Sequence, residues 1–248
     1  CSDAAVLEVQ DGEWRFAHDK LRDGALAELS PQARRALHGK IAAAMETRYQ
    51  DSPERLQSLA YHYASAGETA KEAHYTALAG QQCLRSGAYR DSITFFMRTL
   101  DLTTEAPPGE MAALRIKQVD LKRQIAQAHL GLGEYGKARV LYTENLGTCI
   151  DIPYRKGTAE ALTSLGDVAS ALAEFDAANK HYQEALAIYR ELSEQEGIGR
   201  VLNSLGNVAY ETGRVDEAKK LFQESLTLSR VSGGQWGMAG AMSQSAGG

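Results

Sequence analysis

The sequence predicts an all-α fold, a right-handed superhelix of antiparallel helix pairs that follows a short N-terminal β-hairpin. Three observations support this prediction. Only five of the 248 residues are prolines, and Ala, Leu and Glu, which favour helices, are abundant. A pattern of apolar, aromatic and small residues recurs with a period of 40. An Asp-Gly pair near the start separates two short alternating runs, as in a hairpin.

The hairpin is predicted near the N-terminus. Leu7–Gln10 and Glu13–Phe16 alternate apolar and polar side chains, and Asp11-Gly12 between them is a preferred two-residue turn. A helix is expected to follow at roughly residues 18–29. Residues 1–29 are therefore expected to form a hairpin and a junction helix.

A second helix is predicted over residues 33–49, as a link to the repeats. Its apolar stripe consists of Ala36, Leu37, Ile41 and Met45. Ser30-Pro31 and Ser52-Pro53 each have the pattern of a capping residue followed by proline at the first helical position. These signals place a linking helix within residues 30–54 and a repeat array over residues 55–248.

The repeat is clearest in the second half of the chain. Two consecutive stretches, which begin at Gly157 and Gly197, align without a gap over one period of 40. Leu165-Gly166 in the first stretch aligns with Leu205-Gly206 in the second. Each stretch is predicted to fold as two amphipathic helices joined by a short turn.

Further copies extend the repeat in both directions. One surrounds Ile125-Ala126, and an earlier one surrounds Ala79-Gly80. The spacing between these two copies is 46 residues and includes Pro107-Pro108, which ends a helix. A looser copy is centred on Leu59-Ala60, and a truncated one begins at Gly237. We therefore expect about five helix pairs and an incomplete last unit.

Small residues recur where the two helices of a unit are expected to meet. Gly166 and Ala178 occupy such places, and a larger side chain there would push the antiparallel helices apart. Tyr182 is expected to fill the remaining space against the next unit. Each unit then buries its faces against its neighbours, so that stability is distributed along the array.

This order of residues resembles the tetratricopeptide repeat (TPR), in which Leu-Gly or Leu-Ala in the first helix is followed by an aromatic residue and then by Ala, aromatic and Ala. The usual TPR has about 34 residues and often ends in proline. The present unit has 40 and carries Arg190 and Arg230 at that place, so its second helix is expected to run longer. The context Ser204-Leu205-Gly206-Asn207 is similar to the subclass found in Leu-Gly-Asn repeat adaptors and bacterial signalling ATPases.

The N-terminal segment carries a second resemblance. The string Trp14 to Asp23 and the later Arg34-Arg35-Ala36-Leu37-His38 resemble the junction in large bacterial STAND-type ATPases, where a nucleotide-binding domain and a winged-helix domain lead into a TPR superhelix. The resemblance implies that residues 1–29 are the wing hairpin and junction helix of a winged-helix domain. The chain starts without Met and stops abruptly, so we expect a fragment of a longer regulator.

One glycine-rich motif suggests a nucleotide site but has the wrong context. Gly131–Lys137 satisfies both GxGxxG and GxxxxGK. No strand is predicted before it, and Ala138 stands where a P-loop needs Ser or Thr. We interpret the motif as the turn between two helices, in which Gly133 adopts a left-handed conformation.

Two further clusters receive a structural interpretation. His18-Asp19 lacks the additional His and Asp ligands that a metal-dependent phosphohydrolase needs. A small basic cluster is interpreted as a solvated helix face, with contact to a phosphate as the alternative, and consists of Arg34, Arg35, His38 and Lys40.

Composition excludes several classes of function. The 27 basic and 32 acidic residues give a formal net charge of −5, which argues against a nucleic-acid-binding surface. No apolar run approaches the length of about 18 residues that a membrane span needs, and no signal peptide is recognisable. The three cysteines, Cys1, Cys83 and Cys149, have no metal-ligand spacing, so a reducing, cytoplasmic setting is expected. We find no catalytic constellation and expect neither a cofactor nor a metal.

The TPR resemblance implies that partners bind along the concave face, which first helices line. In the repeat frame the candidate partner-binding residues are Arg123, Gln127, Asp167, Arg200, Asn203, Asn207 and Tyr210, and the other positions expected to be exposed are Asp120, Leu130, Glu160, Thr163 and Ser170. Asn203 and Asn207 lie one turn apart, and each amide offers a donor and an acceptor to a peptide backbone. Arg123 and Arg200 can pair with acidic groups of a partner. Simple solvent exposure is the alternative for each residue.

The sequence thus predicts a non-catalytic TPR interaction or sensor module, as part of a STAND-like ATPase regulator, that binds a peptide, a protein or a small effector. The alternative is a free-standing TPR adaptor that joins two proteins. An enzyme with an unrecognised site ranks last.

Overall fold

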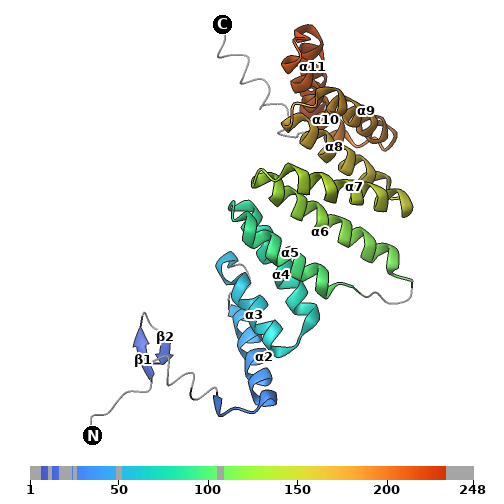
Figure 1. The fold of residues 1–248 in the computed structure, drawn as a ribbon. Coiled ribbons are helices and arrows are strands. Elements are labelled where there is room, and N and C mark those ends of the chain that lie inside the picture. The colour runs from blue at the N-terminus through green and yellow to red at the C-terminus, as the bar shows by residue number, and fades with distance from the viewer. Residues whose placement is uncertain are drawn as a thin grey trace. The chain divides into compact units, whose positions relative to one another are not determined.

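The computed structural model describes residues 7–10, 13–16, 24, 27–48, 52–104 and 109–232. The chain divides into two compact units, Cys1–Ala79 and Gly80–Gly248 (Figure 1). Among the described residues, the first unit contains β1 (Leu7–Gln10), β2 (Glu13–Phe16), α2 (Pro31–Arg48), η1 (Pro53–Arg55) and α3 (Leu56–Ala66). Helix α4 (Thr69–Arg85) belongs partly to each unit.

Strands β1 and β2 pair antiparallel, with Leu7 opposite Phe16 and Gln10 opposite Glu13. They coincide with the two alternating runs of the sequence. The Asp11-Gly12 pair between them lies outside the described residues, as does most of the segment 17–26.

Two helices of the first unit begin at the prolines that the sequence marks. Helix α2 begins at Pro31, and the backbone N–H of Ala33 donates to Ser30 Oγ at 3.2 Å. The 3₁₀ turn η1 begins at Pro53 after the cap residue Ser52, whose side chain makes no capping hydrogen bond. Both predicted starts are therefore confirmed. Proline is favoured at the first position of a helix because an N–H group there would have no partner within the helix.

A charged hub anchors the C-terminal half of α2. The phenols of Tyr63 and Tyr75 donate to the Glu46 carboxylate at 2.5 and 2.6 Å, and Lys71 Nζ donates to it at 2.8 Å. The two tyrosine rings stack with centroids 5.4 Å apart. These donors, Lys71 first, lower the pKa of Glu46 to about 2. The hub therefore stabilises this unit at neutral pH and is lost only as the pH falls from 4.5 towards 2.

The second unit is a TPR-like stack of helices. Its complete helices in the described residues are α5 (Tyr89–Leu102), α6 (Met111–Gly131), α7 (Tyr135–Asp151), α8 (Arg155–Ala171), α9 (Phe175–Glu191), α10 (Gln195–Glu211) and α11 (Val215–Ser232). Figure 1 shows α6 to α11 as successive antiparallel pairs. First helices α6, α8 and α10 alternate with second helices α7, α9 and α11, so the three clearest predicted units are confirmed as helix pairs.

The looser copy around Leu59-Ala60 is wrong as a separate helix pair. Leu59 lies in α3, and the second helix of that copy would be α4. Helix α4 is already the first helix of the copy around Ala79-Gly80, whose second helix is α5. Instead, α3 packs against α2. The small and aromatic residues that suggested the copy belong to the core of the first unit, which includes Ala42, Leu59, Ala60, Tyr63 and Tyr75.

Three of the repeats close around an aromatic ring that lies on a glycine, and the α6–α7 repeat has Ala126 at the equivalent position. A Cβ added to Gly166 would lie 2.5 Å from the ring of Tyr182, and one added to Gly206 would lie 2.5 Å from the ring of Phe222. The same contact joins Gly80 and Phe96. These distances are shorter than real Cβ contacts, so the expectation that only a small residue fits in the first helix is confirmed.

The turns between paired helices repeat one backbone conformation. Gly133, Ala173 and Gly213 are spaced by 40 residues and have φ angles of 72°, 57° and 79°. Gly133 thus has the left-handed conformation predicted for the glycine-rich motif. Ala173 adopts this conformation without being glycine, which strains its backbone.

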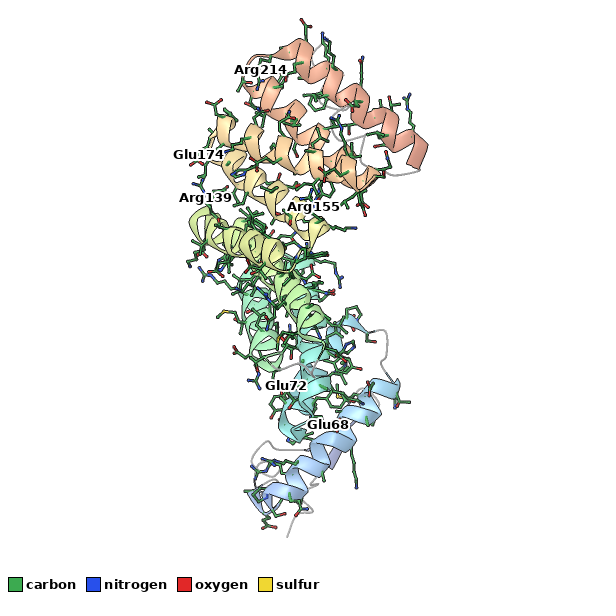
Figure 2. All side chains as sticks on the ribbon, turned by 90° about the vertical axis from the view of Figure 1, so that its right-hand side faces the viewer. Glu68, Glu72, Arg139, Arg155, Glu174 and Arg214 are labelled. Carbon is green, nitrogen blue, oxygen red and sulfur yellow. The ribbon has the colours of Figure 1, made fainter. Side chains whose placement is uncertain are left out.

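Ion pairs on the surface join neighbouring helices of the second unit. Arg139 on α7 pairs with Glu174 before α9 at 2.6 Å, and the two side chains lie together in Figure 2. Arg190 pairs with Glu224 at 2.9 Å, and Arg155 pairs with Glu191. Because these groups are about half exposed, each pair contributes at most about 1 kcal/mol.

The glycine contact predicts the effect of one added methyl group. Gly166→Ala should lower the free energy of unfolding by about 1–3 kcal/mol, because the methyl group overlaps the Tyr182 ring. Gly147→Ala is the matched control: an added Cβ meets nothing within 4 Å, and alanine favours a helix by about 1 kcal/mol. Urea denaturation should show opposite shifts of the midpoint. Equal shifts would contradict the packing role of Gly166.

The strained turn predicts a stabilising substitution. Ala173→Gly should raise the free energy of unfolding by about 0.5–1 kcal/mol, because relief of the left-handed strain exceeds the entropy that glycine gains in the unfolded chain. Ala187→Gly, at an exposed position inside α9, should instead lower it by about 1 kcal/mol. Thermal melts of both variants test this, and a destabilised Ala173→Gly would refute it.

Candidate functional site

The first helices of the last two repeats are buried on almost every side. Between residues 157 and 169 of α8 the accessible side chains are Glu160, Ser164 and Asp167. Between residues 197 and 209 of α10 they are Arg200, Asn203, Ser204 and Asn207. Spacings of three and four residues place each set on one narrow line along its helix. A stripe of polar side chains is thus the only part of these two segments that a partner can contact.

We call nine of the accessible positions on α6, α8 and α10 the first-helix stripe, which comprises Asp120, Arg123, Gln127, Glu160, Asp167, Arg200, Asn203, Asn207 and Tyr210. Gln127, Asp167 and Asn207 are exposed and occupy the same position in successive repeats. Arg200 and Tyr210 are also exposed, whereas Arg123 and Asn203 are half-buried. All seven candidate residues therefore lie on accessible positions of first helices.

Two further positions that the sequence placed on this surface are covered. Thr163 is only 1% exposed, and its hydroxyl donates to the carbonyl of Ala159 at 2.8 Å, so its predicted exposure is wrong. Leu130 is partly buried against the cluster formed around Tyr142 and Val168. Both lie towards a neighbouring helix, which a frame counted from one helix alone does not reveal.

Arg123 joins the first helices of two repeats. Its Nη2 lies 3.5 Å from Asp120 Oδ1 on α6, and its Nε lies 4.0 Å from Glu160 Oε2 on α8. The positive charge of Arg123 is therefore already balanced by two carboxylates, which weakens its predicted role as an anchor for an acidic partner.

Asp167 sits at the centre of the stripe and is held by a tyrosine. The phenol of Tyr182 donates to Asp167 Oδ1 at 2.7 Å. The surrounding protein raises the pKa of Asp167 by desolvation, although the Tyr182 hydrogen bond and the charge of Arg200 oppose this effect. Asp167 is thus open to solvent at the surface of the stripe but crowded by protein on its other sides.

Arg200 borders a small cleft between α8 and α10. The cleft has a volume of about 110 Å³, and its polar lining residues are Lys156, Glu160, Tyr189, Glu194, Glu196 and Arg200. Arg200 Nη2 donates to the Tyr189 phenol at 3.1 Å, while Lys156 pairs with Glu194 at 2.8 Å. Arg200 makes no ion pair with any residue that the structure describes. Its guanidinium therefore keeps free donors for a ligand.

Sequence reasoning assigned Tyr182 to the packing between repeats and missed the role of its hydroxyl and of two further buried tyrosines. Tyr142, Tyr182 and Tyr189 are buried, and burial raises the pKa of each, that of Tyr142 to about 12. Their rings fill the space between helices, while the hydroxyls of Tyr182 and Tyr189 reach Asp167 and Arg200. The available signal was the choice of tyrosine at position 182 where the aligned residue of the next repeat is Phe222.

The structure also shows where some of the other candidate motifs of the sequence lie. Gly131–Lys137 lies between α6 and α7, so it is an inter-helix turn without a preceding strand. His18-Asp19 lies outside the described residues. Of the basic cluster, Arg34, Arg35 and Lys40 are exposed on α2, whereas His38 is half-buried against His62, so the prediction of a solvated face is wrong for His38. Within the described residues no group of three or more potential ligands could hold a metal ion.

The described cysteines are buried, and the described helices are unsuited to crossing a membrane. Cys83 and Cys149 are buried free thiols, and burial raises the pKa of Cys149 to about 11, which keeps it protonated at neutral pH. None of the described helices has the length and hydropathy needed to cross a membrane.

Comparison with protein families identifies the repeats. Models described as tetratricopeptide repeat match residues 118–191 and 199–232, which contain the whole first-helix stripe. These two segments are tetratricopeptide repeats. The TPR assignment thus covers the three helix pairs in which the forty-residue period is clearest. No curated protein matches the chain by sequence.

Solved structures with the same architecture are TPR-like proteins. Aspartyl phosphate phosphatase F from Bacillus subtilis has a TM-score of 0.66 and 13% identity, over 87% of this chain and 56% of that chain. The apo form of RapI has a TM-score of 0.61 and 16% identity, over 80% and 71%. The Rap conjugation gene regulator of plasmid pLS20, solved with the Phr* peptide, has a TM-score of 0.60 and 15% identity, over 81% and 52%. At these identities the likeness shows the fold.

The environment of Asp167 predicts that Asp167→Asn stabilises the chain, although the substitution removes a charge from the first-helix stripe. Asp167→Asn should raise the melting temperature at pH 7, because it removes an ionised carboxylate from a desolvating site and keeps the acceptor for Tyr182. The gain should shrink as the pH falls to 3.8, where the carboxyl group takes up a proton more readily in the folded than in the unfolded chain.

The control for this prediction is Asp176→Asn in the first turn of α9. That exposed carboxylate lies at the positive end of the helix dipole, so its loss should lower the melting temperature slightly at pH 7. A lower melting temperature for Asp167→Asn at pH 7 would contradict the desolvation argument.

Proposed function

We propose that this chain is a non-catalytic TPR module that binds a peptide, or an extended segment of a partner protein, along the first-helix stripe of its second unit. One observation carries the proposal. Helices α8 and α10 bury nearly all of their surface and leave accessible only a line of polar groups on segments of TPR sequence.

The amides of the stripe suit a peptide backbone. The side chains of Gln127, Asn203 and Asn207 make no hydrogen bond within the described residues. Each primary amide can donate to a peptide carbonyl and accept from a peptide N–H at the same time. A ligand that lies across α6, α8 and α10 would therefore be held by its main chain, with the charges of Asp167 and Arg200 contributing selectivity.

The structural comparisons support the kind of partner. The Rap conjugation gene regulator of plasmid pLS20 was solved with a bound peptide, and this chain shares its fold over 81% of its own length. The identity of 15% supports a common architecture and leaves the ligand of this chain to experiment.

The finer proposal is that the module is the sensor arm of a bacterial, cytoplasmic STAND-like ATPase, and a small effector is an alternative ligand there. It rests on the resemblance of the string Trp14 to Asp23 to the junction of such ATPases, in which residues 1–29 would be the wing and junction helix of a winged-helix domain. In the alternative, a free-standing adaptor, the stripe would join two proteins and pass no signal to an ATPase.

The experiment compares two triple variants as bait in a lysate pull-down. The first replaces stripe residues, Arg123→Ala, Asn203→Ala and Asn207→Ala. The second is a matched control with one cation and two amides on exposed faces of second helices, Lys180→Ala, Gln183→Ala and Gln223→Ala. A partner read by mass spectrometry should be retained by the parent and the control and lost by the stripe variant.

The captured partner is then tested as overlapping synthetic peptides by fluorescence anisotropy. We expect one peptide to bind the parent and the control at least tenfold more tightly than the stripe variant. Both variants should melt within a few degrees of the parent, because Asn203 and Asn207 make no hydrogen bond within the described residues and the partly exposed ion pairs of Arg123 contribute at most about 1 kcal/mol each. Equal retention by the two variants, or the absence of any retained protein, would contradict the proposal.

A further inference from the structure

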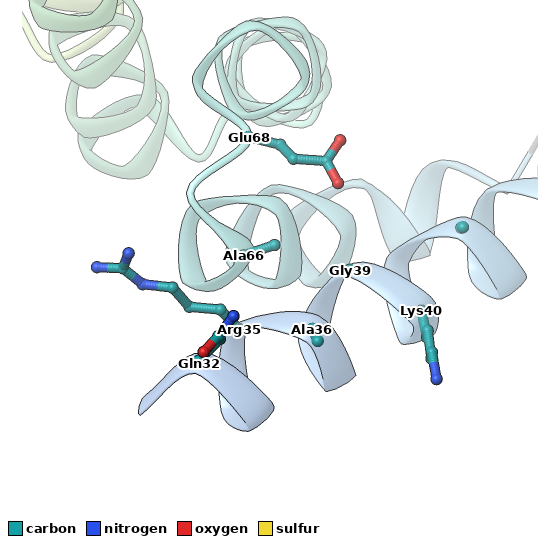
Figure 3. Close-up of a pocket in the computed structure, with 8 residues that line it drawn as sticks. Gln32, Arg35, Ala36, Gly39, Lys40, Ala66 and Glu68 are labelled. Carbon is teal, nitrogen blue, oxygen red and sulfur yellow. The ribbon is translucent and has the colours of Figure 1, made fainter. Parts of the chain in front are cut away.

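The first half of helix α2 is packed more loosely than the rest of the first unit. Ala42 is the one buried residue among the 18 of this helix, and residues 31–36 are all exposed. An open cleft of about 510 Å³ separates this half from the end of α3 (Figure 3). Because few apolar contacts hold the first half of α2, a small number of polar contacts determines whether it stays docked.

A histidine pair provides such a contact. His38 on α2 and His62 on α3 place their Nδ1 atoms 2.9 Å apart, and the ring centroids are separated by 5.1 Å. Tyr61 packs edge-on against both rings, at 5.7 and 5.3 Å. The Glu46 hub lies further along α2, beyond Ala42, so the histidine pair is a side-chain contact between α3 and the first half of α2 that is separate from the hub.

The hydrogen bond between these rings sets a limit on their protonation. One Nδ1 must donate and the other must accept, so at least one ring must be neutral at that atom. When both rings are protonated, two N–H groups and two positive charges face each other across 2.9 Å. The pair must then separate, which removes the contact between the helices.

Burial and the charge of His38 oppose the second proton on His62. On α2 the cations nearest in sequence to His38 are Arg34, Arg35 and Lys40, and Arg35 and Lys40 extend in different directions from the helix in Figure 3. From α3 the pair is faced by the neutral phenol of Tyr61. One carboxylate borders the cleft beside this part of α2, that of Glu68, whose Oε1 would lie 3.5 Å from a Cβ added at Gly39; its charge favours protonation of the pair and acts against the effect of burial. Burial, and then the charge of His38, lower the pKa of His62 below its ordinary value of 6.5.

We propose that His38 and His62 form an acid-sensitive clasp, which docks the first half of α2 on α3 at neutral pH and releases it when both rings are protonated. The released state takes up a proton as the pH falls through 6.5, whereas the docked state resists that proton. Release is therefore favoured increasingly between pH 7 and pH 5. The Glu46 hub stays intact over this range, because the pKa of Glu46 is about 2.

Hydrogen exchange on the complete chain tests the clasp. Samples are labelled at pH 7.5 and pH 5.5 in the presence of EDTA, with labelling times scaled for the intrinsic exchange rate, and read by mass spectrometry. Peptides from residues 31–40 should open several-fold more often at pH 5.5, while peptides from α10 should not change. Equal protection of residues 31–40 at both pH values would overturn the proposal.

Two variants separate the clasp from general acid sensitivity. His62→Gln keeps a polar partner for His38 but does not titrate, so the pH difference at residues 31–40 should vanish. His74→Gln is the matched control, because His74 lies in the same unit, is exposed and packs against Tyr75 without a histidine partner. It should keep the full pH difference. A pH difference that survives in His62→Gln would overturn the proposal.

A second readout covers the case in which His62→Gln fails to fold. Imidazole proton resonances of the parent are followed by NMR from pH 8 to pH 5. The His62 resonances are assigned as those that remain after single Gln variants have identified the resonances of the other five histidines, His18, His38, His74, His129 and His181. The His62 ring should titrate below 6.5, and its midpoint should rise in His38→Gln. A His62 midpoint at or above 6.5 in the parent would overturn the clasp.

Discussion

The contact of an aromatic ring with a glycine is the constraint on which the repeats depend. The ring of Tyr182 on α9 occupies the volume that any side chain at position 166 of α8 would need. The next repeat has the same arrangement with Phe222 and Gly206. The ring fixes the separation of the two helices in a pair and also belongs to the same hydrophobic cluster as Leu202 of the following pair. Packing within a repeat and packing between repeats are therefore set by one side chain.

The same rings support the candidate binding surface. Tyr182 covers Gly166, and its hydroxyl emerges beside the neighbouring residue, Asp167. Tyr189 similarly covers Gly197 and reaches Arg200. A charged group of the stripe is thus held by an atom of the core, so its position depends on the closeness of the helices. A larger residue at either glycine would disturb the stripe as well as the stability of the array.

The repeats could be predicted from the sequence because their constraints are local and periodic. Glycine at positions 166 and 206, the left-handed turn at Gly133 and the proline at the start of α2 each leave a mark within a few residues. The exposure of Gln127, Asp167 and Asn207 followed from the repeat frame. Contacts between distant segments left no such mark. Thr163 is covered by a neighbouring helix, and the copy around Leu59 failed because local residue order does not say which helices pair.

The site was predicted less completely for the same reason. A tyrosine hydroxyl that reaches a first helix, or a pair of histidines 24 residues apart, depends on how helices are packed against each other. The sequence shows the residue types at these positions but not their proximity. The charge of Arg123 is a further example, since its neutralisation by Glu160 depends on the distance between α6 and α8.

The replacement of Tyr182 by Phe222 in the next repeat has a consequence for ligand recognition. In the repeat of α8 a phenol fixes the carboxylate of the stripe, so binding of the proposed peptide ligand would cost little conformational entropy there. Phe222 has no hydroxyl, and the amides of Asn203 and Asn207 have no partner among the described residues. These amides can rotate to suit different ligands. The surface is therefore preorganised at one repeat and adaptable at the next, which suits a receptor that requires one fixed ligand feature and tolerates variation beside it.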